Sequence, residues 1–172
     1  TRINYNKLRI LFLILIMIKN NDNTKDFAEI DLDREKRTGF PEVIFGETKT
    51  PKQSALIAEK IYKKSSLFLI TRTNIETYME VKKLIPEAEF DEQAKMIFSS
   101  KKDDVYEGKV SVVNAGTSDI PIAKEAEITA KLMGVRVESI NDVGVTGIHR
   151  ILNKAEKIKE SKCIVVVAGM EG

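Results

Sequence analysis

Three glycine-containing segments of the sequence each follow a run of β-branched residues and carry side chains that could bind a nucleotide. They are residues 114–119, 141–150 and 168–172. In an open parallel sheet, ligands bind beyond the carboxyl ends of the strands, where helix N-termini present N–H groups and the positive ends of their dipoles. If the three runs are strands of one sheet, the three segments meet at one edge, and we expect a nucleotide pocket there.

The first segment, Asn114-Ala-Gly-Thr-Ser-Asp, has the composition of a phosphate and ribose site. Gly116 allows close approach of the backbone, Thr117 and Ser118 offer hydroxyls, and Asp119 offers a carboxylate for sugar hydroxyls. The alternative is that Ser118 or Asp119 only caps the following helix, which is a common role for both residue types. The sequence leaves both interpretations open.

The other two segments add ionisable side chains. The second, Asn141-Asp-Val-Gly-Val-Thr-Gly-Ile-His-Arg, contains Asp142, the only histidine of the chain, His149, and next to it Arg150. His149 could serve a substrate loop or be a half-buried polar residue near the start of a helix, and these two interpretations also stay open. In the third segment, Glu171 is a carboxylate in a glycine-flanked turn, suited to general acid/base chemistry or to binding a metal ion.

The alternation of apolar runs and amphipathic stretches predicts how these segments are positioned. Residues 119–133 and 147–159 have apolar side chains at helical spacing. They separate three predicted strands, at residues 110–113, 135–140 and 164–167. A strand-helix-strand-helix-strand order predicts a parallel sheet with right-handed crossovers and helices covering its faces.

A smaller α/β unit is predicted upstream. Thr50 followed by Pro51 is typical of a helix start, and the capping-box spacing of Thr73 and Glu76 predicts a second start. The predicted elements are strands at 43–45 and 67–70 and helices at 50–64 and 74–84. The polar stretch at 99–104 is the best candidate boundary. It divides the chain into a leader and linker at 1–25, a small domain at 26–100 and a sheet domain at 105–172.

Composition excludes several classes of protein. The 172 residues contain 28 Lys+Arg and 26 Asp+Glu, a balance that argues against a nucleic-acid partner, which usually needs a basic excess. One cysteine and one histidine exclude an intrachain disulfide, cysteine-rich zinc sites and histidine-cluster metal centres. Because Cys163 begins the run Cys-Ile-Val-Val-Val, we expect it to be buried in the core rather than reactive.

The chain begins with a basic and apolar segment whose role the sequence leaves open. Residues 1–19 carry four basic side chains and no acidic one, and an uninterrupted apolar run extends from Ile10 to Ile18. A transmembrane helix needs about 20 apolar residues, so this run is too short by about half. We expect a buried segment or a non-native leader, with a signal or membrane anchor and a partner-binding helix as alternatives. Because the sequence stops directly after a predicted strand, we also expect the chain to be incomplete.

Four motifs stand in a fixed order along the chain. They are residues 31–46 with Lys49-Thr-Pro, then Val112-Val-Asn-Ala-Gly-Thr-Ser-Asp-Ile-Pro-Ile-Ala, Asp142-Val-Gly-Val-Thr-Gly-Ile-His-Arg and Val165-Val-Val-Ala-Gly-Met-Glu-Gly. Together they resemble the LarB family of nickel-pincer cofactor biosynthesis proteins, which is related to the PurE-type phosphoribosyl-aminoimidazole carboxylases. The resemblance covers residues 27–172. It implies an α/β fold in which a three-layer, flavodoxin-like (PurE-like) parallel sheet domain, incomplete here, follows a small α/β domain.

The resemblance also implies an activity. Family members carboxylate the pyridinium ring of nicotinic acid adenine dinucleotide, with CO2 or bicarbonate as co-substrate, and cleave its phosphoanhydride. The products are AMP and pyridinium-3,5-biscarboxylic acid mononucleotide. No tightly bound cofactor is implied, and Mg²⁺ fits a reaction that cuts a pyrophosphate. We expect a cytoplasmic homo-oligomer without a membrane or nucleic-acid partner.

Roles for individual residues follow from the same resemblance. Thr117, Ser118 and Asp119 would hold the phosphate and ribose, His149 and Arg150 match the second substrate loop, and Glu171 matches a carboxylate at the reacting end. The catalytic cysteine of the family lies downstream of the Ala-Gly-Met-Glu-Gly motif, so Cys163, which precedes that motif, is not its equivalent. We therefore expect these 172 residues to carry part of the substrate site and to be inactive by themselves.

Two other functions stay open. A PurE-type aminoimidazole ribonucleotide carboxylase or mutase would share the fold and the phosphate loop, and a non-catalytic nucleotide-binding module would share the pocket. The charged residues 31–41 and the form of the second loop favour the LarB family over the plain PurE type.

Overall fold

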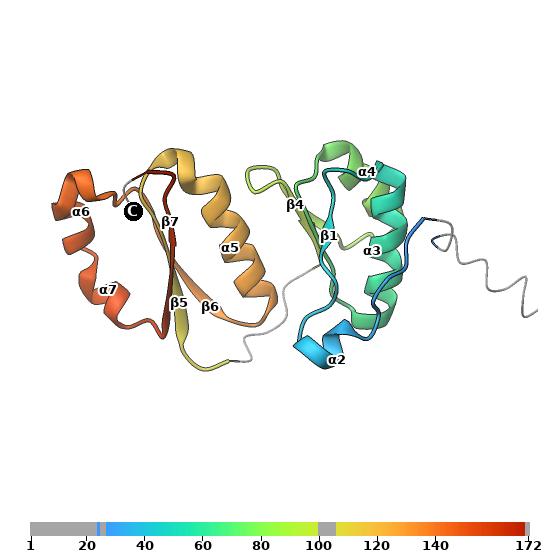
Figure 1. Cartoon of the computed structure of the whole chain (residues 1–172), viewed down its shortest axis with the longest axis horizontal. Coiled ribbons are helices and arrows are strands. Elements are labelled where there is room, and N and C mark those ends of the chain that lie inside the picture. The colour runs from blue at the N-terminus through green and yellow to red at the C-terminus, as the bar shows by residue number, and fades with distance from the viewer. Residues whose placement is uncertain (1–23, 25–26, 100–105, 171–172) are drawn as a thin grey trace, which may run out of the picture.

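The computed structural model describes residues 24, 27–99 and 106–170, which form two α/β units, each built on its own sheet (Figure 1). The apolar run at 10–18, most of the predicted boundary at 99–104 and Glu171 lie outside the described residues. The elements of the first unit are α2 (Arg34–Thr38), β1 (Ile44–Phe45), α3 (Pro51–Ser65), β2 (Leu69–Thr71), α4 (Ile75–Leu84), β3 (Glu89–Asp91) and β4 (Met96–Phe98). Those of the second are β5 (Lys109–Asn114), the 3-10 turn Thr117–Asp119, α5 (Ile120–Leu132), β6 (Arg136–Ile140), the 3-10 turn Val145–Gly147, α6 (Ile148–Leu152), α7 (Ala155–Lys159) and β7 (Cys163–Val167).

The sheet of the first unit has the strand order β1-β2-β4-β3, in which β1 and β2 are parallel and the other pairs are antiparallel. The predicted start of α3 is confirmed: the Thr50 side chain accepts a hydrogen bond from the Gln53 N–H, and Pro51 is the first helical residue. The predicted capping box of the next helix is wrong by one residue. Asn74, one residue later, caps α4, and its side chain accepts the Thr77 N–H at 3.0 Å. In a capping box the Thr73 N–H would donate to the Glu76 side chain, but here it donates to the Lys95 carbonyl in the β3–β4 hairpin.

The apolar run at 67–70 is buried on both faces of this sheet, as its continuous hydrophobicity predicts. Phe68 and Ile70 pack in a cluster with α3 and α4 on one face. Leu67 and Leu69 point to the other face, where they pack in a second cluster with Leu132 of α5. Because successive strand residues alternate between faces, a strand covered by helices on both sides needs an apolar residue at every position.

The second unit has the parallel sheet that the sequence predicts, with the strand order β6-β5-β7. Helix α5 lies on the face toward the first unit, and α6 and α7 lie on the other face (Figure 1). Ile151 and Ile158 of these two short helices pack against Val113 and Ile140 of the sheet. Helix α5 therefore lies between the two sheets, and the Lys124–Asp91 ion pair at 3.2 Å adds a polar contact between the units.

Two expectations for the second unit are wrong. The predicted helix 147–159 is interrupted after Leu152, since Asn153 is a poor helix former, and the two halves α6 and α7 follow the sheet separately. Cys163 is exposed, not buried. It begins β7, which is an edge strand of the described sheet. Because α6 and α7 pack over β5 and β6, β7 is less covered, and Val166 on the same strand is also 61% exposed.

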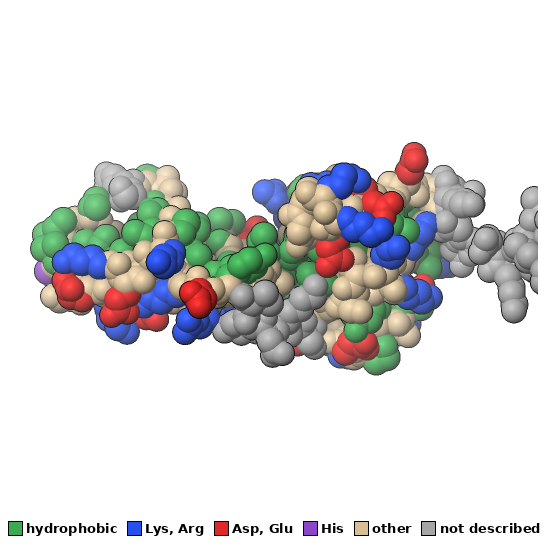
Figure 2. All heavy atoms as spheres, turned by 90° about the horizontal axis from the view of Figure 1, so that it is seen from below, with side chains coloured by type: hydrophobic (Ala, Val, Ile, Leu, Met, Phe, Trp, Pro, Cys, Tyr) green, Lys and Arg blue, Asp and Glu red, His purple; other side chains and the backbone are tan. Residues whose placement is uncertain are grey.

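Hydrophobic side chains cover much of the surface of the second unit (Figure 2). Large examples that are about half exposed or more are Ile122, Ile148, Leu152, Ile164, Val166 and Met170. Across the described ranges, no helix combines the length and the apolar character needed to cross a membrane.

Candidate functional site

The three glycine-containing segments meet at one edge of the second sheet. Strand β5 is central, and the connections that follow it and β6 lead to helices on opposite faces. In doubly wound sheets, the place where the connections change direction is called the switch point, and a crevice opens there beyond the carboxyl ends of the strands. The parallel register of β5 with β6 and β7 places the ends of all three strands, and so the three segments, at this crevice.

Asp119 connects the first and third segments. One of its carboxylate oxygens accepts the Gly116 N–H at 2.9 Å, and the other accepts the Gly169 N–H at 3.0 Å. The side chain makes no capping hydrogen bond to α5, so the structure does not support the interpretation of Asp119 as a simple cap of that helix. A carboxylate held by two backbone N–H groups fixes the spacing of the two loops, while its remaining lone pairs can still accept a ligand hydroxyl.

Asn114 connects the first and second segments and is fully buried at the end of β5. Its side-chain oxygen accepts the Asp142 N–H at 3.0 Å, and its side-chain amide donates to the side-chain oxygen of Asn141. Its backbone carbonyl accepts the Val143 N–H at 3.1 Å. The sequence shows Asn114 as the first residue of its segment, but nothing in the sequence marks it as the residue that holds two loops together.

Gly144 brings the second loop against the first. Its N–H donates to the Ala115 carbonyl at 2.8 Å, and a Cβ on this residue would lie only 2.9 Å from the same oxygen. The close backbone approach therefore requires glycine, since real Cβ atoms essentially never come so close.

These loops surround an open cavity of about 380 Å³. Its lining residues are Ala115, Gly116, Ser118, Asp119, Gly144, Val145, Thr146, Gly169 and Met170. Three of the predicted substrate residues are among them, Gly116, Ser118 and Asp119, whereas Thr146 was not predicted. Thr146 stands in the second motif, but its hydroxyl gave no separate signal in the sequence.

The other predicted residues lie outside this lining. Thr117 is exposed on the 3-10 turn beside it. Arg150 forms an ion pair with Asp142 at 2.9 Å, and His149 is exposed on α6. The structure thus brings the first segment and the two glycine turns together, and it leaves the charged end of the second segment at the periphery.

The lining can bind a phosphate and a flat ring, but it does not make a metal centre. N–H groups at the start of the turn and helix, with the Ser118 and Thr146 hydroxyls, suit phosphate oxygens. Val145 and Met170 offer apolar surface. Asp119 is the only carboxylate of the described lining, and no three His, Cys, Asp or Glu side chains gather anywhere in the described part of the chain. Cys163 is at the amino end of β7, where it pairs with Val110. It therefore lies at the opposite end of the strands from the cavity.

A small α/β unit joined to a parallel sheet with helices on both faces, with glycine loops around a crevice at its switch point, defines a doubly wound type of α/β protein. Residues 22–102 match the family model described as the LarB/PurE-like N-terminal domain. The first unit is therefore similar to the N-terminal domains of the LarB/PurE-like family, and the second unit is consistent with a PurE-like, flavodoxin-like sheet domain.

The chain is also similar to the uncharacterized protein MJ0165 of Methanocaldococcus jannaschii. The two are 33% identical over 171 residues, a match that covers 91% of this chain and 65% of that protein. The chain thus spans about 65% of the length of this relative.

Proposed function

We propose that the protein is a LarB-type carboxylase and hydrolase that acts on nicotinic acid adenine dinucleotide in nickel-pincer nucleotide biosynthesis. The observation that carries the proposal is the cavity of about 380 Å³ at the switch point of the sheet, lined by the family's glycine loops. The match of residues 22–102 to the LarB/PurE-like family model supports the carboxylase-type chemistry. The particular substrate rests on the resemblance of the second and third segments to the LarB motifs.

The mononucleotide half of the substrate is assigned to this cavity. The backbone N–H groups of Thr117 and Ser118, with the Ser118 hydroxyl, bind its phosphate, and Asp119 accepts a ribose hydroxyl. Val145 and Met170 flank the pyridinium ring. Thr117 contributes only its backbone N–H in this arrangement, since Thr117 is not among the residues that line the cavity.

In the proposed reaction, a CO2 molecule, supplied as such or as bicarbonate, replaces a ring hydrogen that leaves as a proton. Water then adds across the phosphoanhydride and releases AMP. Glu171 is assigned to proton transfer at the ring, and His149 and Arg150 to a substrate loop that closes from α6. Mg²⁺ would be held largely by the pyrophosphate of the substrate, and no step is assigned to it.

The same proposal includes the setting of the reaction, a homo-oligomer in the cytoplasm. Exposed apolar side chains on β7, such as Ile164 and Val166, support burial of this strand by further polypeptide. Sedimentation of the full-length protein tests the assembly.

Calorimetric titration of the full-length protein tests the substrate assignment. We expect nicotinic acid adenine dinucleotide to bind more tightly than aminoimidazole ribonucleotide, and Ser118→Ala to weaken that binding about tenfold. Arg136→Gln, a change on the exposed face of β6, is the control and should leave affinity unchanged. Tighter binding of the imidazole nucleotide would favour a PurE-type carboxylase. Binding without turnover by the full-length protein would favour a non-catalytic nucleotide-binding module.

A further inference from the structure

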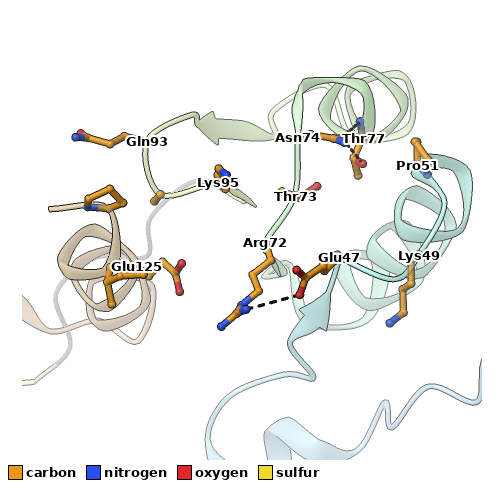
Figure 3. Close-up of a pocket in the computed structure, with 14 residues that line it drawn as sticks. Glu47, Lys49, Pro51, Arg72, Thr73, Asn74, Thr77, Gln93, Lys95 and Glu125 are labelled. Carbon is orange, nitrogen blue, oxygen red and sulfur yellow. Dashed lines mark hydrogen bonds and ion pairs between the residues drawn. The ribbon is translucent and has the colours of Figure 1, made fainter. Parts of the chain in front are cut away.

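A second cavity, of about 560 Å³, lies between the first unit and the start of α5 (Figure 3). Its walls are the loops that follow β1 and β2, the β3–β4 hairpin and the first turn of α5. None of its lining residues belongs to the cavity at the switch point. We call this second cavity the inter-unit cleft.

Two helices of the first unit begin at the inter-unit cleft. Strands β1 and β2 are parallel, so their carboxyl ends lie side by side, and α3 and α4 start directly beyond them. Pro51 at the start of α3 and Asn74 at the cap of α4 both line the cleft. The positive ends of two helix dipoles therefore face the same space, an arrangement that favours a negatively charged ligand.

Thr73 supplies independent evidence for a ligand. Its residue is only 7% exposed, it lines the cleft, and its hydroxyl has no hydrogen-bond partner. A buried hydroxyl without a partner costs free energy, and such groups in native proteins generally have a functional explanation. In Figure 3 the Thr73 side chain lies among the lining residues, with its hydroxyl on the side of Thr77 and Pro51, where the two helices begin.

The charges around the cleft also favour an anion. Lys49, Arg72 and Lys95 line it, against the two acidic side chains Glu47 and Glu125. Arg72 and Glu47 form a long ion pair of 3.6 Å, and both side chains are more than half exposed. A pair of this kind is weak, so the Arg72 guanidinium can turn to a bound anion at little cost.

We propose that the inter-unit cleft binds the phosphate group of a small molecule, with Thr73 and Arg72 as its ligands and with the dipoles of α3 and α4 favouring the negative charge. The site differs from the cavity at the switch point and does not depend on the reaction proposed above. Its phosphate comes from a nucleotide or from inorganic phosphate, two sources that a titration can separate.

Titration of the 172-residue chain with inorganic phosphate and with AMP, followed through backbone amide NMR shifts, tests the proposal. We expect saturable shifts at the amides of Thr73 and Asn74. AMP binding at least tenfold tighter than inorganic phosphate identifies a nucleotide site, and equal affinities identify a site for the phosphate group alone. Shifts confined to residues 116–119 would overturn the proposal while leaving the site at the switch point intact.

Three variants sharpen the test. Thr73→Val keeps the shape of the side chain and removes the hydroxyl, so it should weaken phosphate binding about tenfold while leaving the Tm unchanged or higher. Glu47→Gln removes a competing charge and should tighten binding several-fold at low salt. Glu156→Gln removes the same charge from an exposed position of α7, on the face of the second sheet away from the first unit (Figure 1), and is the matched charge control. Unchanged affinity of Thr73→Val would refute the role of the hydroxyl and with it the proposed site.

Discussion

Replacement of Leu132 by alanine tests whether the two units fold as one. Leu132 is the last residue of α5 and only 2% exposed. Its side chain completes the apolar cluster on one face of the first unit's sheet. The other buried members of this cluster are Phe40, Leu67, Leu69, Ala94 and Met96. The substitution therefore removes contacts from a core that belongs to the other unit.

The expected cost follows from the burial of this side chain. Loss of three carbons from a buried leucine removes about 2.4 kcal/mol of transfer free energy at about 0.8 kcal/mol per methylene, and the remaining cavity raises the total. Leucine-to-alanine changes in protein cores cost about 2–5 kcal/mol. We expect a value in the lower half of that range, because a cluster between two units can close around the gap more easily than a central core.

Urea unfolding of the 172-residue chain, followed by far-UV circular dichroism, measures this cost. Leu132→Ala should lower the free energy of unfolding by about 2–3 kcal/mol, and it should broaden or split the transition as the units separate. Leu152→Ala is the matched control, since this leucine of α6 is 64% exposed and should cost less than about 0.5 kcal/mol. Equal losses in the two variants would refute the conclusion that α5 couples the units.

Three further predictions concern the contact between the units and the loops at the switch point. Burial raises the pKa of Asp91, but a backbone hydrogen bond and the Lys124 ammonium outweigh it and hold that pKa below its ordinary value. Because the pKa of this carboxyl is lower in the folded state, the carboxylate contributes its full stabilisation at any pH above its pKa in the unfolded chain, which is about 4. The contribution is lost as the pH falls through the lower pKa of the folded state. Asp91→Asn should therefore reduce the loss of stability on acidification, at a cost of about 0.2–1 kcal/mol at pH 7, as measured by thermal unfolding between pH 2 and pH 7. Gly144→Ala should cost about 1–3 kcal/mol in the same assay, because its Cβ would meet the Ala115 carbonyl at 2.9 Å; a cost near zero would show that the two loops can move apart freely. Asn114→Ala leaves buried polar partners unsatisfied and should lower stability by about 1–3 kcal/mol. Faster hydrogen exchange confined to residues 141–144 would show that it acts by releasing the second loop.

Local patterns predicted the elements that depend on local chemistry. Thr50 and Pro51 marked the start of α3 because capping needs only neighbouring residues. The continuous apolar run at 67–70 predicted a strand with both faces covered, although not that Leu132 of the other unit provides part of the cover. The glycine segments predicted which loops meet at the carboxyl ends of the strands, since strand order and parallel connection determine which ends meet.

The expectations that failed depended on contacts between distant residues. Cys163 begins an apolar run that would be buried in a central strand, but β7 is an edge strand and its neighbours α6 and α7 lie elsewhere. Thr73 had the right spacing for a cap, yet its N–H donates to Lys95 in the hairpin. The bond from the Gly169 N–H to the Asp119 carboxylate, which joins residues fifty positions apart, was not predicted either.

The position of α5 between two sheets has a consequence for how the chain is made. Synthesis proceeds from the N-terminus, so the strands of the first unit leave the ribosome before α5 exists. Until residues 120–132 follow, Leu67, Leu69 and Met96 form an apolar face without its partner helix. A nascent chain at this stage exposes an apolar surface that chaperones can bind and through which chains can aggregate. A fragment cut after β4 would carry the same uncovered face permanently, so we expect it to be less stable than the first unit within the whole chain.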